Sequence, residues 1–220
     1  MRTISFFGAF LLLCAYAFGQ SSVPVKDSAS GAAQPGAASL PHDRHGGLSV
    51  SADSYVDAIR AKEKFGKADP VPAGILPVEV FLSNETNVPI HIDLSTIQLV
   101  VRPPEGRRQD IDSLAPAEVA YAIAHPEGAP APHGPRFPTI GIHLSNDKKA
   151  DQLTKILQPL SLDADIVPPM GAIHGFLFFN LSRDMTLAEN ASLYLPDAAI
   201  MPLNKPLMFF EVSLGKAPDR

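Results

Sequence analysis

Proline sets the strongest limit on what this chain can fold into. The 220-residue sequence contains 22 prolines, about twice the share of an average protein. A proline has no backbone N–H to donate, and its fixed φ excludes it from helix interiors and from central strand positions. Because the prolines recur along most of the sequence, long regular elements are excluded. The chain is therefore expected to form short strands and short helices, separated by proline-containing connections.

The overall composition excludes disorder of the chain as a whole and argues against nucleic acid as a partner. Hydrophobic residues make up 45% of the sequence and charged residues only 19%, so the chain has enough apolar surface to bury a core. Its formal net charge is −5. A protein that binds nucleic acid needs a basic surplus to neutralise the phosphate backbone, and this sequence has none.

The first 19 residues resemble a secretory signal peptide in their layout. Arg2 provides a positive start, residues 4–17 form an apolar run, and small residues follow at Ala15, Ala17 and Gly19. Cleavage is predicted after Ala17 or after Gly19. The run is too short to span a bilayer comfortably, so no stable membrane span is expected after cleavage, and an N-terminal anchor is the alternative. The prediction is an exported protein, either periplasmic or extracellular.

The only cysteine, Cys14, lies inside this signal segment. The mature chain then contains no cysteine, which excludes thiol catalysis, disulfide bonds and cysteine-ligated zinc. A domain without disulfides must be stabilised by burial of apolar surface. Export without disulfides favours a bacterial envelope over an animal secretory route.

The remaining sequence divides into three parts. Residues 20–50 are rich in Ser, Ala, Gly and Pro and are predicted to be a flexible tether. Residues 51–68 are predicted to contain an amphipathic helix that is capped by Asp53, has Tyr55, Val56 and Ile59 on one face, and stops at Gly66. This helix either packs on the main domain or docks a partner. Residues 69–216 form the main domain.

The main domain shows the period-two pattern of strands. Apolar residues alternate from Leu76 to Leu82, with Glu79 on the opposite, polar side. A second strand over 90–94 is expected to return beside the first, and 97–101 to continue the sheet. Further strands are predicted at 140–144, 173–181, 192–195 and 207–214, and inserted helices at 116–124 and 147–158. The predicted fold is mainly β, an immunoglobulin-like antiparallel β-sandwich with two or three short helices.

No local motif for an activated nucleophile, a phosphate-binding loop or a dinucleotide is present, so no catalytic residue and no cofactor is predicted. Histidines on strands are the remaining candidates for chemistry. His91 and His143 alternate with apolar neighbours and so face a polar side, where Glu79 or Asp93 can join them; His174 lies on a later strand. Imidazole and carboxylate suit zinc or copper. Solvated surface histidines are the alternative.

Two segments carry a resemblance to a known class of protein. They are LPVEVFLSNET at 76–86 and IVPPMGAIHGFLFF at 166–179, in which Gly175 allows the close approach of a neighbour. The pattern resembles exported bacterial proteins with an immunoglobulin-like sandwich, and the similarity covers residues 75–101 and 166–214. The resemblance implies a binding or accessory module and supplies no catalytic residue.

These observations lead to three hypotheses of function. The first is an exported, non-enzymatic binding module that engages an envelope or extracellular protein. The second is a hydrolase that uses His143 or His174 with a carboxylate. The third is a periplasmic zinc- or copper-binding protein. The sequence contains no signal for the oligomeric state.

Overall fold

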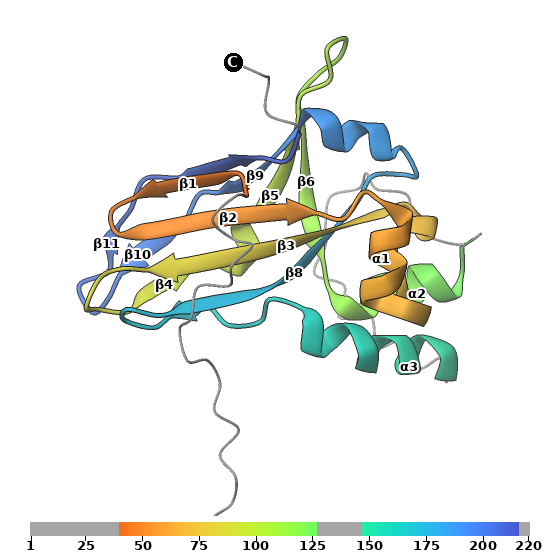
Figure 1. The fold of residues 1–220 in the computed structure, drawn as a ribbon, viewed down its shortest axis with the longest axis horizontal. Helices are drawn as coiled ribbons and strands as arrows, with labels where there is room; N and C mark the ends of the chain where they lie inside the picture. Colours follow the sequence, from red (N-terminus) through yellow and green to blue (C-terminus); the bar gives the residue numbers. More distant parts are fainter. Residues whose placement is uncertain (1–39, 127–146, 216–220) are drawn as a thin grey trace, which may run out of the picture.

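The computed structural model describes residues 40–126 and 147–215. Within these ranges the protein is mainly β, with antiparallel sheets and three α-helices (Figure 1). The predicted signal peptide, the strand predicted at 140–144 and His143 lie outside the described residues. None of the helices in the two described ranges is long and apolar enough to cross a membrane.

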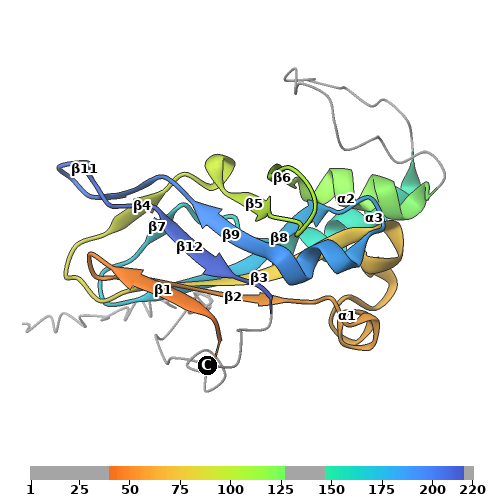
Figure 2. The same cartoon turned by 90° about the horizontal axis from the view of Figure 1, so that it is seen from above.

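The larger sheet has eight strands. In spatial order they are β1 (His42–His45), β2 (Leu48–Ser54), β3 (Ile75–Asn84), β8 (Ala172–Asn180), β6 (Gln109–Leu114), β5 (Gln98–Val101), β9 (Ala191–Leu195) and β12 (Phe210–Ser213). The sheet curls toward a barrel, so that β1 and β12 lie side by side (Figure 2). The Asp43 carboxylate accepts the Glu211 N–H at 3.1 Å, and the His45 ring stacks on Phe210 at 3.8 Å.

A smaller sheet and three helices complete the fold. The smaller sheet has the order β11 (Lys205–Pro206), β10 (Ala198–Ile200), β4 (Ile90–Ile92) and β7 (Ile166–Val167). The helices are α1 (Ala58–Phe65), α2 (Pro116–Ala124) and α3 (Lys148–Leu157). They gather at the end of the molecule opposite β10 and β11 (Figure 1).

The pair β3–β8 lies between two hydrophobic cores. The two strands are paired at nine positions, from Ile75↔Asn180 to Ser83↔Ala172. On the inner side, Leu76, Val78 and Phe179 belong to a core that the curled sheet shares with the smaller sheet. On the outer side, Ile75, Phe176 and Phe178 pack under the three helices. The prediction of a strand with one buried face is therefore wrong for β3, because helices cover part of its second face.

Several predicted elements are confirmed. Strands lie close to the predicted positions at β3, β5, β8 and β9, and α2 spans the predicted residues 116–124. Helix α3 lies within 147–158 and buries Ala150, Leu153 and Leu157, whereas Ile156 is 41% exposed. An immunoglobulin-like arrangement of the strands stays a prediction.

The predicted pairing of the strand at 90–94 is wrong. β4 is shorter than expected and lies in the smaller sheet, where it pairs with β10 and β7 and not with β3. Asp93 ends the strand, because its side chain accepts the Ser95 N–H and caps a short 3-10 helix, η4 (Leu94–Thr96). The turn after β3 thus carries the chain from one sheet into the other.

The prediction that the flexible tether extends to residue 50 is also wrong. Residues 42–54 form the hairpin β1–β2, whose two-residue turn consists of Gly46 and Gly47 with φ of 60° and 81°. A positive φ at both central residues is the requirement of a type I′ hairpin turn, and glycine meets it without strain. The first described part of the segment predicted to be flexible is therefore an edge of the larger sheet.

Helix α1 begins later than predicted. Its N-cap is Asp57, which accepts the N–H groups of Ile59 and Arg60, and it ends at Gly66 as expected. Asp53 lies near the end of β2 instead, where it is paired with Glu79 of the neighbouring strand β3. The predicted apolar face is wrong as well: Ile59 is 73% exposed, and the helix buries Ala61 and Phe65.

Gly175 lies where another segment crosses β8. A Cβ at this position would be 2.6 Å from the Leu162 backbone N, and the Leu162 N–H donates to the Phe176 carbonyl at 3.0 Å. The predicted close approach is confirmed. The neighbour is the backbone of residues 161–162.

We expect Gly175→Ala to destabilise the fold, because the added methyl group cannot fit without moving a backbone. Overpacking of this kind costs about 1–3 kcal/mol. The free energy of unfolding in urea measures the effect. Gly106→Ala is the matched control, since a Cβ there makes only ordinary contacts at 3.4 Å. Equal stability of the two variants would contradict the crossing.

Candidate functional site

Two of the predicted site residues come together on the larger sheet. Glu79 on β3 and His174 on β8 extend from the outer face of adjacent strands, and His174 Nδ1 lies 3.5 Å from Glu79 Oε1. The imidazole ring also stacks on Phe81 at 5.5 Å. The side chain of His174 is half exposed, whereas that of Glu79 is buried.

Glu79 is the centre of this polar cluster, contrary to the prediction that it faces solvent. It is 6% exposed, because α1 covers its side of β3. The Tyr55 hydroxyl donates to Glu79 Oε2 at 2.9 Å, and Lys64 Nζ from α1 lies 3.6 Å from Oε1. A buried carboxylate requires such partners, so the cluster connects α1 to the sheet.

The pKa of Tyr55 is shifted by its position in this cluster. The pKa of Tyr55 is raised to about 12, mainly because the phenol is buried and secondly because it donates a hydrogen bond to the Glu79 carboxylate. Arg60 lies over the Tyr55 ring at 4.1 Å and forms an ion pair with Asp53. The hydrogen bond to Asp53 raises the pKa of Arg60 above its usual range, so the guanidinium stays charged.

His91 lies elsewhere, on β4 of the smaller sheet. Its Nε2 is 3.9 Å from Asp165 Oδ2. The hydroxyl group and the N–H of Ser95 both donate to the Asp93 carboxylate. These two hydrogen bonds, of which the hydroxyl's has the larger effect, lower the pKa of Asp93. His91 and Asp93 therefore do not join Glu79, and the described residues hold no group of three or more histidine, cysteine or acidic side chains that could bind a metal ion.

The Glu79–His174 pair has the first requirement of a general base, a carboxylate beside an imidazole. A hydrolase also needs a nucleophile within hydrogen-bond reach of the base. Among the residues that the structure describes, the contacts of His174 are with Glu79 and Phe81, and no serine or threonine hydroxyl bonds to it. The contacts of Glu79 with Tyr55 and with Lys64 of α1 hold this helix on the sheet.

A different kind of site lies at the end of the molecule opposite the helices, where four turns meet (Figure 1). These are the turns at 46–47, 84–89, 168–171 and 201–204. Backbone hydrogen bonds join them: Glu85 N to Gly47 O, Met170 N to Thr86 O, and Met201 N to Pro89 O, each of 2.8–2.9 Å. The four turns thus form one continuous surface.

Asn84 holds this end together from inside. It is 1% exposed, and its Nδ2 donates to the carbonyl groups of Val88, Val167 and Pro168 at 2.8–3.2 Å. Its Oδ1 accepts both the N–H and the hydroxyl of Thr86. A single amide side chain therefore joins the turn after β3 to the turn before β8.

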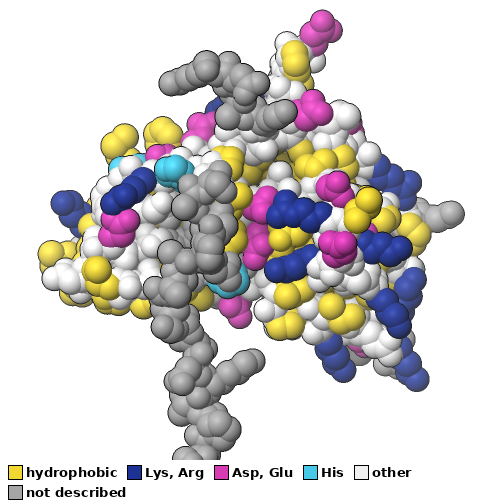
Figure 3. Space-filling view, viewed as in Figure 1, with side chains coloured by type: hydrophobic (Ala, Val, Ile, Leu, Met, Phe, Trp, Pro, Cys, Tyr) yellow, Lys and Arg dark blue, Asp and Glu magenta, His cyan; other side chains and the backbone are white. Residues whose placement is uncertain are grey.

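Large apolar side chains on this end are exposed to solvent. Leu203 is 87% exposed, Met170 70% and Met208 69%; we refer to these three residues as the apolar end. Met208 is tied to the turns through the hydrogen bond between its carbonyl and His45 Nε2, 3.0 Å long. Figure 3 shows hydrophobic side chains beside basic and acidic ones at this end. Exposed apolar groups gathered in one place are typical of an interaction surface.

The apolar end was not among the predicted sites, although the sequence contains a signal for it. Residues 198–210 include two methionines, two leucines and two phenylalanines but only one charged residue, Lys205. Only its last part, from Leu207 on, was predicted, as the beginning of a strand over 207–214, whereas β12 begins at Phe210. The segment forms a hairpin tip followed by a short connection, where Leu203 and Met208 have no layer to cover them.

Comparisons with known proteins identify no relative. No protein-family model matches the chain, and no similar protein was found among curated sequences or among solved structures.

We expect Asn84→Asp to destabilise the protein, because it places a carboxylate oxygen against three carbonyl groups and removes their donor. Leaving buried polar groups unpaired costs on the order of 3 kcal/mol. Unfolding in urea at neutral pH measures the loss. Asn87→Asp makes the same chemical change at an exposed position of the same turn and should have little effect; a similar loss in both variants would disprove the role of Asn84.

Tyr55 predicts how stability depends on pH. Its pKa is raised from 10.0 to about 12, so the folded state keeps a proton that the unfolded state loses. The stabilisation is complete below pH 10 and is lost as the pH rises toward 12. Between these values the free energy of unfolding should fall more steeply for the natural protein than for Tyr55→Phe. Parallel curves would contradict the shift.

Proposed function

We propose that this protein is an exported, non-enzymatic binding module that docks another protein through its apolar end. The observation that carries the proposal is the exposure of Leu203, Met170 and Met208 on turns joined by hydrogen bonds. The relation to immunoglobulin-like exported modules and the location outside the cytoplasm are parts of the same proposal. They rest on the sequence patterns described above.

The chemistry of the apolar end favours a protein partner. Methionine side chains are flexible and polarisable, which suits a surface that adapts to the shape of a partner. Charges of both signs border the apolar end, because Arg44 on β1, beside the turn at 46–47, and Glu85 in the turn at 84–89 form an exposed ion pair. An apolar centre with a mixed polar rim is the usual anatomy of a protein–protein interface. Anionic lipid would instead favour a rim that is basic throughout.

The Glu79–His174 pair supports a second candidate function, hydrolysis with His174 as the general base. The supporting observation is the distance of 3.5 Å between His174 Nδ1 and Glu79 Oε1. The half-exposed imidazole is accessible to a substrate. No hydroxyl group of the described residues bonds to this imidazole, and the nucleophile in this second proposal is water.

Site-specific photocrosslinking in envelope extracts of the source cells tests the docking surface. We expect a crosslinking residue at position 170 and one at position 203 to capture the same protein, because both positions lie on one surface. The Met208→Ser substitution should reduce both adducts. Position 59 is the control, since Ile59 is similarly exposed, at 73%, but lies on α1 at the other end.

Three outcomes would refute the docking proposal. They are the absence of any adduct from positions 170 and 203, the same adducts from position 59, and capture of a second copy of this chain only. Pelleting with phosphatidylglycerol vesicles that depends on Leu203 would assign the surface to lipid instead.

Hydrolysis is tested with a panel of ester, peptide and glycoside substrates. If the second function is correct, His174→Ala abolishes a measurable activity, because the imidazole is the only base that the cluster offers to a substrate. His42→Ala, at an exposed position on β1, leaves the activity unchanged. Activity that survives His174→Ala rejects this role.

A further inference from the structure

A cleft opens beside β8 because two unrelated segments share one edge of this strand. β6 pairs with β8 only through its last two residues, since the chain turns into α2 after Ala115. Farther along the same edge of β8, the Leu162 N–H donates to the Phe176 carbonyl. The space between these two partners is not filled by either of them.

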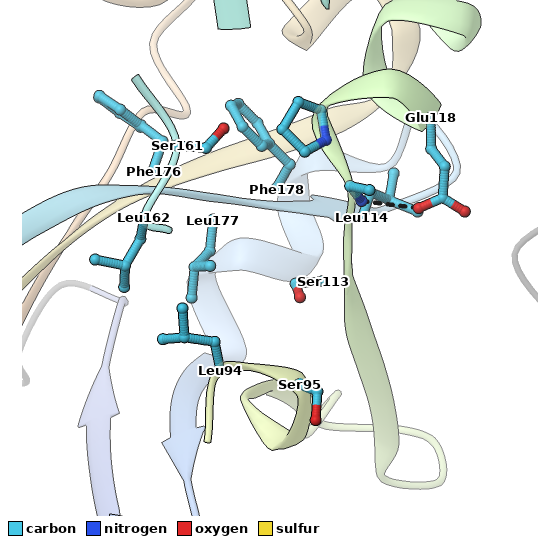
Figure 4. A pocket seen from close by; sticks show the side chains of 12 residues that line it. Leu94, Ser95, Ser113, Leu114, Glu118, Ser161, Leu162, Phe176, Leu177 and Phe178 are labelled. Carbon is cyan, nitrogen blue, oxygen red and sulfur yellow. Dashed lines mark hydrogen bonds between the residues drawn. The ribbon is translucent and has the colours of Figure 1, made fainter. Parts of the chain in front are cut away.

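The cleft has a volume of about 320 Å³, which lies at the lower limit of pockets that bind small molecules. Its deeper walls are apolar side chains from three parts of the chain: Leu94 from η4, Leu162, and Leu177 and Phe178 from β8 (Figure 4). An apolar group of a ligand would therefore be desolvated between the two hydrophobic cores.

Two of the three serine hydroxyl groups that line the cleft, those of Ser95 and Ser161, are acceptors. Ser95 Oγ donates its proton to Asp93 Oδ1 at 2.6 Å, and Ser161 Oγ donates to the Leu157 carbonyl at 3.0 Å. A hydroxyl has a single proton to donate. Because both protons are used within the protein, the oxygen atoms of Ser95 and Ser161 can only accept hydrogen bonds from a ligand.

The one charged residue in the lining is also an acceptor. Glu118, at the start of α2, accepts the Ala115 N–H through Oε2 at 2.8 Å, and Figure 4 shows its carboxylate at one side of the cleft. The twelve lining residues all belong to the described chain, and none of them is lysine, arginine or histidine. The electrostatic character of the cleft is therefore negative.

We propose that this cleft binds a small organic cation, an apolar group that ends in an ammonium or a similar donor. The apolar part lies against Leu177 and Phe178, and the ammonium donates to the carboxylate of Glu118, which lies on a different side of the cleft from Ser95 and Ser161 (Figure 4). A carboxylate of the same size is disfavoured, because the one charged side chain of the lining, Glu118, is negative. This site is independent of the apolar end, with which it shares no residue.

The test uses three probes with one apolar skeleton: phenylbutylammonium, phenylbutanol and phenylbutyrate. Calorimetry with the mature chain measures their dissociation constants at low ionic strength. The cation should bind most tightly, the alcohol more weakly and the carboxylate not measurably. Added salt should weaken binding of the cation only.

Matched variants locate the binding. Glu118→Gln keeps an acceptor for the Ala115 N–H but removes the charge, so binding of the cation should fall about tenfold while that of the alcohol is unchanged. Glu105→Gln makes the same change at an exposed turn residue and should leave all three constants unchanged. Ala115→Leu places a larger side chain at the cleft and should weaken both the cation and the alcohol.

The proposal is overturned if phenylbutyrate binds as tightly as the cation, or if Glu118→Gln and Glu105→Gln have equal effects. It is also overturned if none of the three probes binds to a protein whose unfolding transition is intact. If the cation binds with the same dissociation constant to the Ala115→Leu variant, the site lies elsewhere and the assignment of this cleft is rejected.

Discussion

The ladder between β3 and β8 is the interaction on which the rest of the structure depends. Its nine paired positions bring residues about a hundred positions apart in the sequence into one central ribbon. Leu76 and Phe179 on one face support the core of the curled sheet, and Ile75 and Phe178 on the other face support the helical layer. Since both cores share these two strands, disturbing the ribbon weakens both. The close crossing at Gly175 lies in the middle of it.

The candidate surfaces arise where the regular pairing around this ribbon ends. At one end, the turn after β3 is fixed to the turn before β8 by the buried amide of Asn84, and Met170 projects from the second of these turns. On the other edge of β8, only the last two residues of β6 pair with the strand, and residues 161–162 contact it farther along. A cleft with acceptor groups lies between these two segments. The Glu79 cluster has the opposite role. Its donors, Tyr55 and Lys64, are used to attach α1 to the sheet.

Much of the secondary structure could be predicted from local signals, whereas most of the candidate sites could not. Pro116 at the first position of α2 and Gly66 after α1 marked helix ends correctly, because capping depends on near neighbours in the sequence. The hairpin at Gly46 and Gly47 had a local signal too, but the polar, glycine-rich residues around it favoured a tether. For Glu79, strand parity predicted a solvent-facing carboxylate. Parity indicates which face a side chain occupies, but not whether a helix covers that face.

The sequence by itself determined where prolines and glycines interrupt the regular elements and which stretches alternate as strands. It also determined that a core without cysteine is stabilised by burial of apolar surface and not by disulfide bonds. Only the tertiary structure decided that β4 leaves the sheet of β3, that His174 meets Glu79 while His91 does not, and that Leu203 and Met208 stay exposed. The reason is physical. Backbone preferences and periodicity act over a few residues, whereas strand pairing, burial of a carboxylate and the opening of a cleft depend on contacts between segments far apart in the chain.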